Sequence, residues 1–214
     1  MYKLSIKIVL VALAIVSGVY ARAEPQASPL VPPTENILGR SQADWSRSWW
    51  QWAASFDRSE SPIADKTGGL CRSKQTGAVW FLAGTYGTRR TVRTCTVPSG
   101  KYLFFPLINY VVYPVEGMPL TCASATQTAA RVTLDVSSLV LEIDGKRFKD
   151  LEVHRQATRE CFDLNALSGG LVAPSAANGY YVMLRPLSRG THILNFGGIL
   201  PGISQAVTYT LRVE

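Results

Sequence analysis

The N-terminus of the chain has the layout of a secretory signal peptide, and this feature constrains what the rest of the chain can become. Lys3 and Lys7 precede an apolar run over residues 8–16, and the segment closes with a small-x-small sequence at residues 21–23. We expect cleavage before Glu24 and export to the periplasm or out of the cell. Because those compartments are oxidising, cysteines of the exported chain can pair. Cleavage also removes the membrane-like segment, so we expect no transmembrane segment afterwards.

Four cysteines lie beyond the predicted cleavage site, and an even number in an exported chain favours two disulfides. They are Cys71, Cys95, Cys122 and Cys161. Three connectivities are possible, and we favour Cys71–Cys95 with Cys122–Cys161 because these pairs close the shorter loops. A metal site is the alternative reading, but no C-x-x-C pair is present, and zinc sites usually draw ligands from such pairs. We therefore expect neither a metal nor another cofactor.

Length and charge favour one exported domain. Removal of residues 1–23 leaves 191 residues, enough for a single domain with a sizeable core. The leader holds three of the 22 basic residues and no acidic residue, so the remainder carries 19 basic and 15 acidic residues, a formal net charge of +4. This mild surplus suits weak attraction to anionic envelope surfaces and does not favour a nucleic-acid partner.

Four prolines predict an N-terminal arm or linker over residues 24–40, followed by the domain over residues 41–214. The oligomeric state stays open.

A tryptophan-rich stretch predicts an amphipathic helix at the start of this domain. Ser41 can cap its N-terminus, and Asp44 lies at the capping-box position. Four aromatic residues then recur at spacings of four, three and four, which places them on one helical face. They are Trp45, Trp49, Trp52 and Phe56. Such a stripe usually belongs to a core, whereas Trp50 lies off the stripe and is expected to be the exposed aromatic residue.

The rest of the chain has the features of antiparallel β-structure. Alternating or continuously apolar runs are separated by Gly, Pro and Asp-Gly turns. We expect strands over residues 78–84, 91–97, 102–112, 139–143, 147–154, 180–184, 191–196 and 206–213, with loop-like residues 163–179 and a turn over residues 197–202. Pro106 predicts a bend or bulge, and residues 121–138 are ambiguous, with a second helix capped by Ser124 or Thr126 as one alternative. The fold class predicted is mainly β, an antiparallel β-sandwich of jelly-roll or immunoglobulin-like type.

Catalytic chemistry has weak support in the sequence. No G-x-S-x-G nucleophile motif is present. The candidates for a loop-built hydrolase site are His192, His154 and Asn109, together with an acid that the sequence does not single out. Glu152 could pair with His154 on one strand face, but an ordinary charged strand edge looks the same. Nothing local supplies a carboxylate to His192, so a non-enzymatic protein is favoured.

Two groups of residues are candidates for binding. Trp50 could stack on a sugar ring as an aromatic platform. Arg89, Arg90 and Arg93 form the basic cluster, for which we favour a solvated hairpin tip, with binding to anionic polysaccharide or lipid headgroups as the alternative. We therefore favour an exported binding or structural protein of the cell envelope or extracellular space, with a glycan or another envelope component as its partner. The alternatives are an exported hydrolase and a subunit of an envelope assembly, with residues 102–112 partly at its interface.

Several segments resemble a group of exported bacterial proteins. The shared motifs are W-W-Q-W-A, V-W-F-L-A-G, C-x-V-P-x-G-K-x-x-F-F-P-x-x-N and P-L-x-x-G-x-H, and here they begin at Trp49, Val79, Cys95 and Pro186. The likeness covers most of the exported chain. No activity is attached to that group, so the resemblance implies a single exported domain and adds no catalytic residue. It also implies that Trp50, Asn109 and His192 belong to recurring motifs, which can serve the fold as well as a site.

Overall fold

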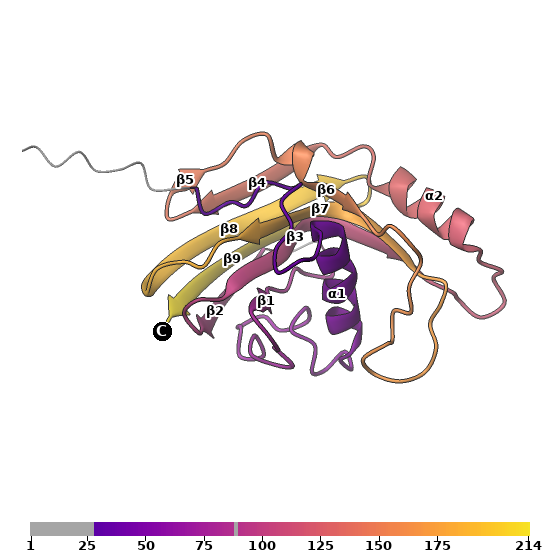
Figure 1. Ribbon diagram of the computed structural model, residues 1–214, viewed down its shortest axis with the longest axis horizontal. Helices are drawn as coiled ribbons and strands as arrows, with labels where there is room; N and C mark the ends of the chain where they lie inside the picture. The colour runs from indigo at the N-terminus through magenta and orange to yellow at the C-terminus, as the bar shows by residue number, and fades with distance from the viewer. Residues whose placement is uncertain (1–27, 88–89) are drawn as a thin grey trace, which may run out of the picture.

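Two β-sheets packed face to face form the body of the protein, in a computed structural model that describes residues 28–87 and 90–214 (Figure 1). The first sheet has the strand order β1-β3-β7-β6, and the second has the order β2-β9-β8-β4-β5. The strands are β1 (Val79–Phe81), β2 (Thr91–Val97), β3 (Tyr102–Val112), β4 (Ser138–Ile143), β5 (Lys146–Arg147), β6 (Arg155–Ala157), β7 (Ala176–Leu184), β8 (Gly190–Leu200) and β9 (Ile203–Val213). The helices are α1 (Gln42–Ala54) and α2 (Cys122–Val132), with a 3-10 turn η1 (Leu151–His154). The predicted mainly β, sandwich-like fold is confirmed. The predicted signal peptide lies outside the described residues.

Both sheets are mixed, which corrects the expectation of a purely antiparallel sandwich. β1 runs parallel to β3, and β2 runs parallel to β9. The remaining pairs are antiparallel. A parallel pair requires a crossover between its strands. For β1 and β3 that crossover is β2, which belongs to the opposite sheet, so the chain returns to the first sheet in its original direction.

The main core lies between the two sheets. Alternate side chains of β3 and β7 meet alternate side chains of β8 and β9, and the rings of Phe105 and Phe196 lie 4.5 Å apart at their centroids. The predicted bulge at Pro106 is confirmed, because the β3–β7 register shifts there. Gln205 of β9 donates its side-chain amide to the carbonyls of Pro106 and Leu107, at 2.9 Å each. Residues 103–108 are buried, with Phe104 on the α1 side of the sheet and Leu103, Phe105, Leu107 and Ile108 between the sheets, so only the ends of the segment 102–112 are accessible to a partner.

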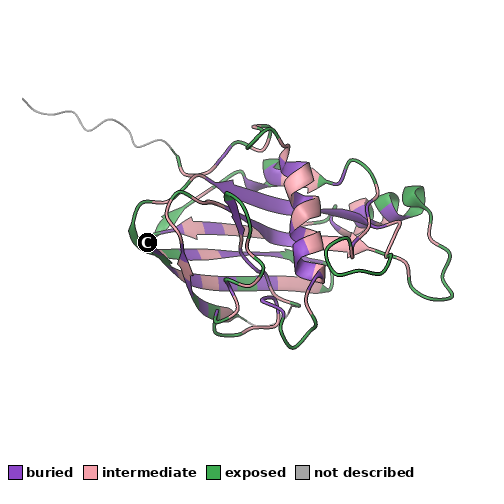
Figure 2. Cartoon of the chain, turned by 60° about the horizontal axis from the view of Figure 1, so that its bottom comes forward, coloured by how far each residue is buried: buried purple, intermediate pink, exposed green. Residues whose placement is uncertain are grey.

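Helix α1 covers the outer face of the four-stranded sheet and creates a second core. Figure 2 shows the helix running across the strands. The predicted capping box between Ser41 and Asp44 is present. Trp49 and Trp52 are buried against the outward-facing side chains of β3 and β7. The helix ends before Phe56, whose ring still packs on Trp52 with centroids 5.6 Å apart.

Both predicted disulfides form, Cys71–Cys95 and Cys122–Cys161. The first joins the long loop after α1 to β2, and the second joins the first residue of α2 to the segment after β6. In the entropic account, loops of 24 and 39 residues correspond to about 3–4 kcal/mol of stabilisation each. Paired cysteines are typical of oxidising compartments outside the cytosol.

Four local expectations are corrected. Helix α2 is capped by Thr121, and Ser124 is the capping-box partner rather than the cap. The predicted return strand over residues 147–154 is limited to β5, because the chain leaves the sheet and turns into η1. β7 starts inside the segment read as a loop, and β8 continues through the expected turn at Gly197 and Gly198.

The described part of the N-terminal arm is ordered against the sandwich. The backbone N–H of Val31 donates to the carbonyl of Met183 at 2.9 Å, and the N–H of Arg185 donates to the carbonyl of Pro29 at 2.7 Å. The arm thus lies along the end of β7. It forms one wall of a cavity described below.

Candidate ligand-binding face

The outer face of the five-stranded sheet is accessible to solvent. Along β9, buried positions alternate with accessible ones, as expected for a strand with one face in a core. Val92, Ile193 and Ile199 are exposed on the outer face of β2 and β8. This face therefore contrasts with the outer face of the other sheet, which α1 covers.

A hollow of about 370 Å³ crosses this face over β4, β8 and β9. The floor of the hollow is formed at Gly197 of β8 and Ala206 of β9, which pair with each other. On its other side, Gly197 pairs with Val140 of β4. A side chain at Gly197 would collide with the backbone carbonyl of Gln205, so the close approach of β8 and β9 requires glycine. Because no side chain can stand at position 197, the hollow is open above this point of the sheet.

A row of four polar side chains forms one wall of the hollow. The Arg90 guanidinium donates to the Thr208 hydroxyl at 3.3 Å, and that hydroxyl donates to the Asn195 amide oxygen at 2.7 Å. The Asn195 amide nitrogen donates in turn to a Glu142 carboxylate oxygen at 3.0 Å. The four residues come from the segment before β2 and from β9, β8 and β4. We call this set the polar row.

The opposite wall is less polar. It consists of Ser138 at the start of β4 and Ile199 of β8, which is 47% exposed. A ligand in the hollow would therefore meet an apolar patch on one side and aligned hydrogen-bonding groups on the other. Small-molecule sites commonly combine these two features.

Both ends of the polar row, the Arg90 guanidinium and the Glu142 carboxylate, have hydrogen-bonding capacity left for a ligand. A carboxylate has more acceptor sites than the single bond from Asn195 uses, and a guanidinium has five N–H donors, of which Thr208 receives one. Hydroxyl groups can donate to Glu142, and an acceptor or negative group can bind Arg90 with charge assistance. The arrangement suits a hydroxyl-rich ligand with an acidic group.

The structure places His192 at one end of β8, away from this hollow. Its Nδ1 lies 2.7 Å from the Asp144 carboxylate, and its Nε2 lies 2.9 Å from the Ser188 carbonyl. Burial opposes the charged ring, but these two acceptors outweigh it and raise the pKa of His192. Both ring nitrogens thus already have hydrogen-bond partners within the fold. Sequence reasoning missed Asp144 because it lies in a distant hairpin turn.

His154 and Asn109 do not join His192. His154 lies on η1 rather than on a strand, and burial lowers its pKa, so the ring is kept neutral. Asn109 lies in the four-stranded sheet opposite Gly179, and its amide donates to the hydroxyl of Tyr181 at 3.3 Å. The three residues expected for a hydrolase thus occupy three separate places.

Trp50 is not an exposed platform. It is half-buried beneath the loop before β7, and its indole N–H donates to the Tyr181 hydroxyl at 2.8 Å. Its ring also packs edge-on against Trp49, with centroids 5.1 Å apart. Burial raises the pKa of the Tyr181 phenol, so this hydroxyl stays neutral. Trp50 therefore anchors the helix to the sheet instead of facing solvent.

The basic cluster is divided by the fold. Arg93 is 1% exposed, and its guanidinium donates to four backbone carbonyls and to the Tyr209 hydroxyl. The expectation of a solvated Arg93 is wrong, because the loop after α1 folds over the side chain. Arg89 lies outside the described residues. Arg90 is exposed and belongs to the polar row.

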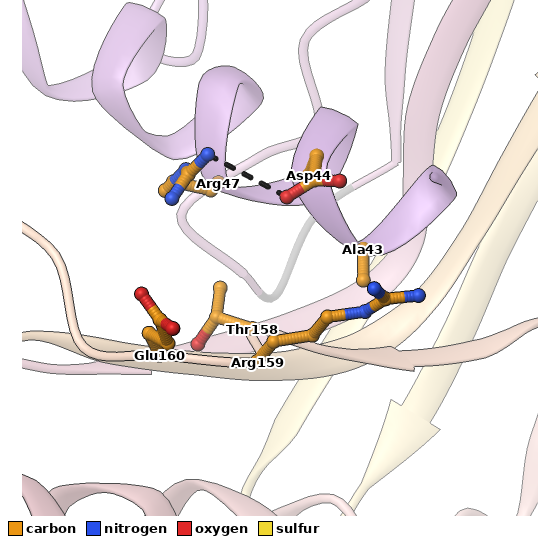
Figure 3. A pocket seen from close by; sticks show the side chains of 6 residues that line it. All are labelled: Ala43, Asp44, Arg47, Thr158, Arg159 and Glu160. Atoms are coloured by element: carbon orange, nitrogen blue, oxygen red, sulfur yellow. Dashed lines mark hydrogen bonds and ion pairs between the residues drawn. The ribbon is translucent and has the colours of Figure 1, made fainter. Parts of the chain in front are cut away.

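A smaller pocket of about 250 Å³ lies beside the N-terminal half of α1 (Figure 3). Asp44, Arg47 and Thr158 in this pocket already make contacts within the fold. The Ser41 hydroxyl holds the pKa of Asp44 below its usual value, and Arg47 pairs with the same carboxylate at 3.5 Å. The Thr158 hydroxyl donates to the Ala177 carbonyl at 3.3 Å. The pocket is lined by Ala43, Asp44, Arg47, Thr158, Arg159 and Glu160.

Within residues 28–87 and 90–214, no group of three or more His, Cys, Asp or Glu side chains could hold a metal ion. Over the same described ranges, no helix is both long and apolar enough to cross a membrane.

Comparisons with known proteins leave the function open. A scan against models of protein families finds no match, and a search of curated proteins finds none. Among solved structures, a chain from "Structure of PbICP-C in complex with falcipain-2" aligns with 64% of this chain and 100% of its own length. The identity is 11% and the TM-score is 0.28. A likeness this weak indicates neither the fold nor the function.

Most of the polar row was missed by the sequence analysis. Only Arg90 was selected, because it belongs to a run of basic residues. Asn195 and Thr208 are single polar residues on alternating strands, which is also the pattern of an ordinary solvent face. The signal that could have found the hollow is Gly197, two residues after Asn195 and on the same face of the strand, since glycine inside a strand often marks a close approach.

Proposed function

We propose that this protein is a non-enzymatic binding module of the cell envelope or extracellular space. Its ligand is a glycan that carries an acidic group, held in the hollow on the outer face of the five-stranded sheet. The observation that carries the proposal is the polar row from Arg90 to Glu142 beside a floor of Gly197 and Ala206. The two disulfides fit an extracellular or periplasmic location.

The polar row supports a saccharide more than an apolar ligand. Sugar hydroxyls both donate and accept, and the row offers a carboxylate, an amide, a hydroxyl and a guanidinium within one line. The apolar wall at Ile199 can contact the C–H face of a sugar ring. Arg90 adds a preference for a carboxylate or sulfate group on that ring.

Glycan-array binding tests this proposal. Wild-type protein should bind acidic glycans, and Asn195→Ala should weaken binding by about tenfold because it breaks the middle of the polar row. Arg90→Gln should abolish the preference for acidic over neutral glycans. Thr94→Ala, an exposed change on β2 outside the hollow, is the matched control and should bind as wild type does.

The proposal fails under two outcomes. Glycan binding that is equal in wild type, Asn195→Ala and Arg90→Gln would place the ligand elsewhere. Failure of wild type to bind any acidic glycan would remove the proposed ligand class. Thermal unfolding of each variant shows whether a loss of binding reflects a loss of folding.

A further inference from the structure

A second cavity, of about 500 Å³, lies at one end of the sandwich. The β4–β5 hairpin, the β7–β8 connection and the N-terminal arm surround it. Its volume falls in the range of about 300–1,000 Å³ that is usual for small-molecule sites. It is lined by Pro29, Ile143, Asp144, Lys146, Phe148, Arg185, Pro186, Leu187, Ser188 and His192.

The inner wall of this end cavity is apolar. Ile143 belongs to the core between the sheets, and Phe148 and Leu187 are partly buried side chains packed against that core. Phe148 follows β5, and Leu187 lies between β7 and β8, so the apolar wall bridges the two sheets. Contact with an apolar ligand would extend the core outwards and remove this surface from water.

The rim of the end cavity has one cation that no acid of the described chain neutralises. Asp144 accepts from His192 and from the backbone N–H of Ile193, at 2.7 Å each. Arg185 makes a two-pronged ion pair with Glu35, at 2.8 and 3.0 Å. Lys146 has no ion-pair partner within residues 28–87 and 90–214, and its ammonium lies 5.6 Å from the Phe148 ring.

We propose that the end cavity binds a carboxylate that bears an apolar chain or ring. The carboxylate binds the Lys146 ammonium, and the apolar part packs against Phe148 and Leu187. Arg185 and His192 add positive charge nearby, although Glu35 and Asp144 balance it. This site is separate from the hollow on the sheet face and uses none of the polar row.

Titration with decanoate tests the proposal, with binding followed by calorimetry and by amide chemical shifts. Decanoate should bind with shifts centred on residues 143–148 and 185–192. Acetate, which lacks the chain, and octyl glucoside, which lacks the charge, should each bind at least about tenfold more weakly. Phenylacetate distinguishes an aromatic ligand from an acyl ligand by its affinity relative to decanoate.

Matched lysine variants locate the carboxylate. Lys146→Gln should weaken decanoate binding about tenfold, whereas Lys149→Gln, an exposed change outside the cavity, should leave it unchanged. Both sites are exposed, so both variants should fold. Leu187→Gln should also weaken binding, and its thermal unfolding shows whether the fold is intact.

Three results would overturn the inference. The first is no saturable decanoate binding by the folded wild-type protein. The second is acetate binding as tightly as decanoate, which would mean that the site recognises only an anion. The third is an equal loss of affinity in Lys146→Gln and Lys149→Gln, which would indicate general surface charge.

Discussion

β7 and β9 lie in opposite sheets of the same sandwich, yet their surroundings differ completely. All nine positions of β7 are buried, because the inter-sheet core lies on one side and α1 lies on the other. Buried positions of β9 alternate with accessible ones, because its outer face meets solvent. One outer face is thus committed to stability, and the other is available for recognition.

Truncating one large side chain at each outer face should give the largest difference between the two faces. Trp49→Ala should lower the free energy of unfolding by about 3–5 kcal/mol, since the ring is buried and its N–H donates to the Leu82 carbonyl at 3.0 Å. Ile193→Ala on the exposed face should lower it by about 1 kcal/mol or less. Urea unfolding of the two variants measures the difference. Similar losses would show that the faces are not distinct.

The disulfide between Cys71 and Cys95 connects the covered side of the molecule to the exposed sheet. Changing both cysteines to serine should cost about 3 kcal/mol, because the closed loop of 24 residues regains freedom in the unfolded chain. Proteolysis should then begin within residues 57–78, the loop after α1. The double change of Cys122 and Cys161 is the control, and should instead expose the segment around α2. Unchanged cleavage sites in both variants would contradict the prediction that each disulfide protects a different segment.

The covered face was the easier one to read from the sequence. Tryptophans at helical spacing and a Ser41–Asp44 capping box are local signals, so α1 was predicted together with its buried stripe. The two disulfides followed from cysteine number and loop length. Each of these predictions needs only residues that are near one another in sequence or a count of one residue type.

Features that depend on distant neighbours were missed. Asn178 and Gly179 were included in the loop-like residues 163–179, but they lie inside β7, where Gly179 allows close approach to Asn109 of β3. Arg93 looks like a surface residue until the carbonyls that surround it are brought together by folding. The polar row is likewise assembled from four separate segments. These features could not be predicted from the sequence, because each one depends on which distant segments pair in the folded chain.

The exposed sheet also has a contact that pH can switch, whereas apolar packing under α1 does not titrate. His192 has a raised pKa in the folded protein, through Asp144 and Ser188 against the effect of burial. Its stabilisation is therefore fully present below the unfolded value of about 6.5 and is lost as the pH rises through the folded value. Asp144→Asn should lower the free energy of unfolding by about 1 kcal/mol at pH 5.5, and this difference should shrink on raising the pH to about 9.

Asp57→Asn is the control for this smallest effect, since Asp57 is exposed and its side chain makes no hydrogen bond within the described ranges. Its unfolding free energy should differ little from that of wild type at either pH. Urea unfolding at both pH values gives the comparison directly. A difference between wild type and Asp144→Asn that stayed the same at both pH values would mean that a charged His192 does not contribute, because only a charged ring loses its attraction to Asp144 on deprotonation.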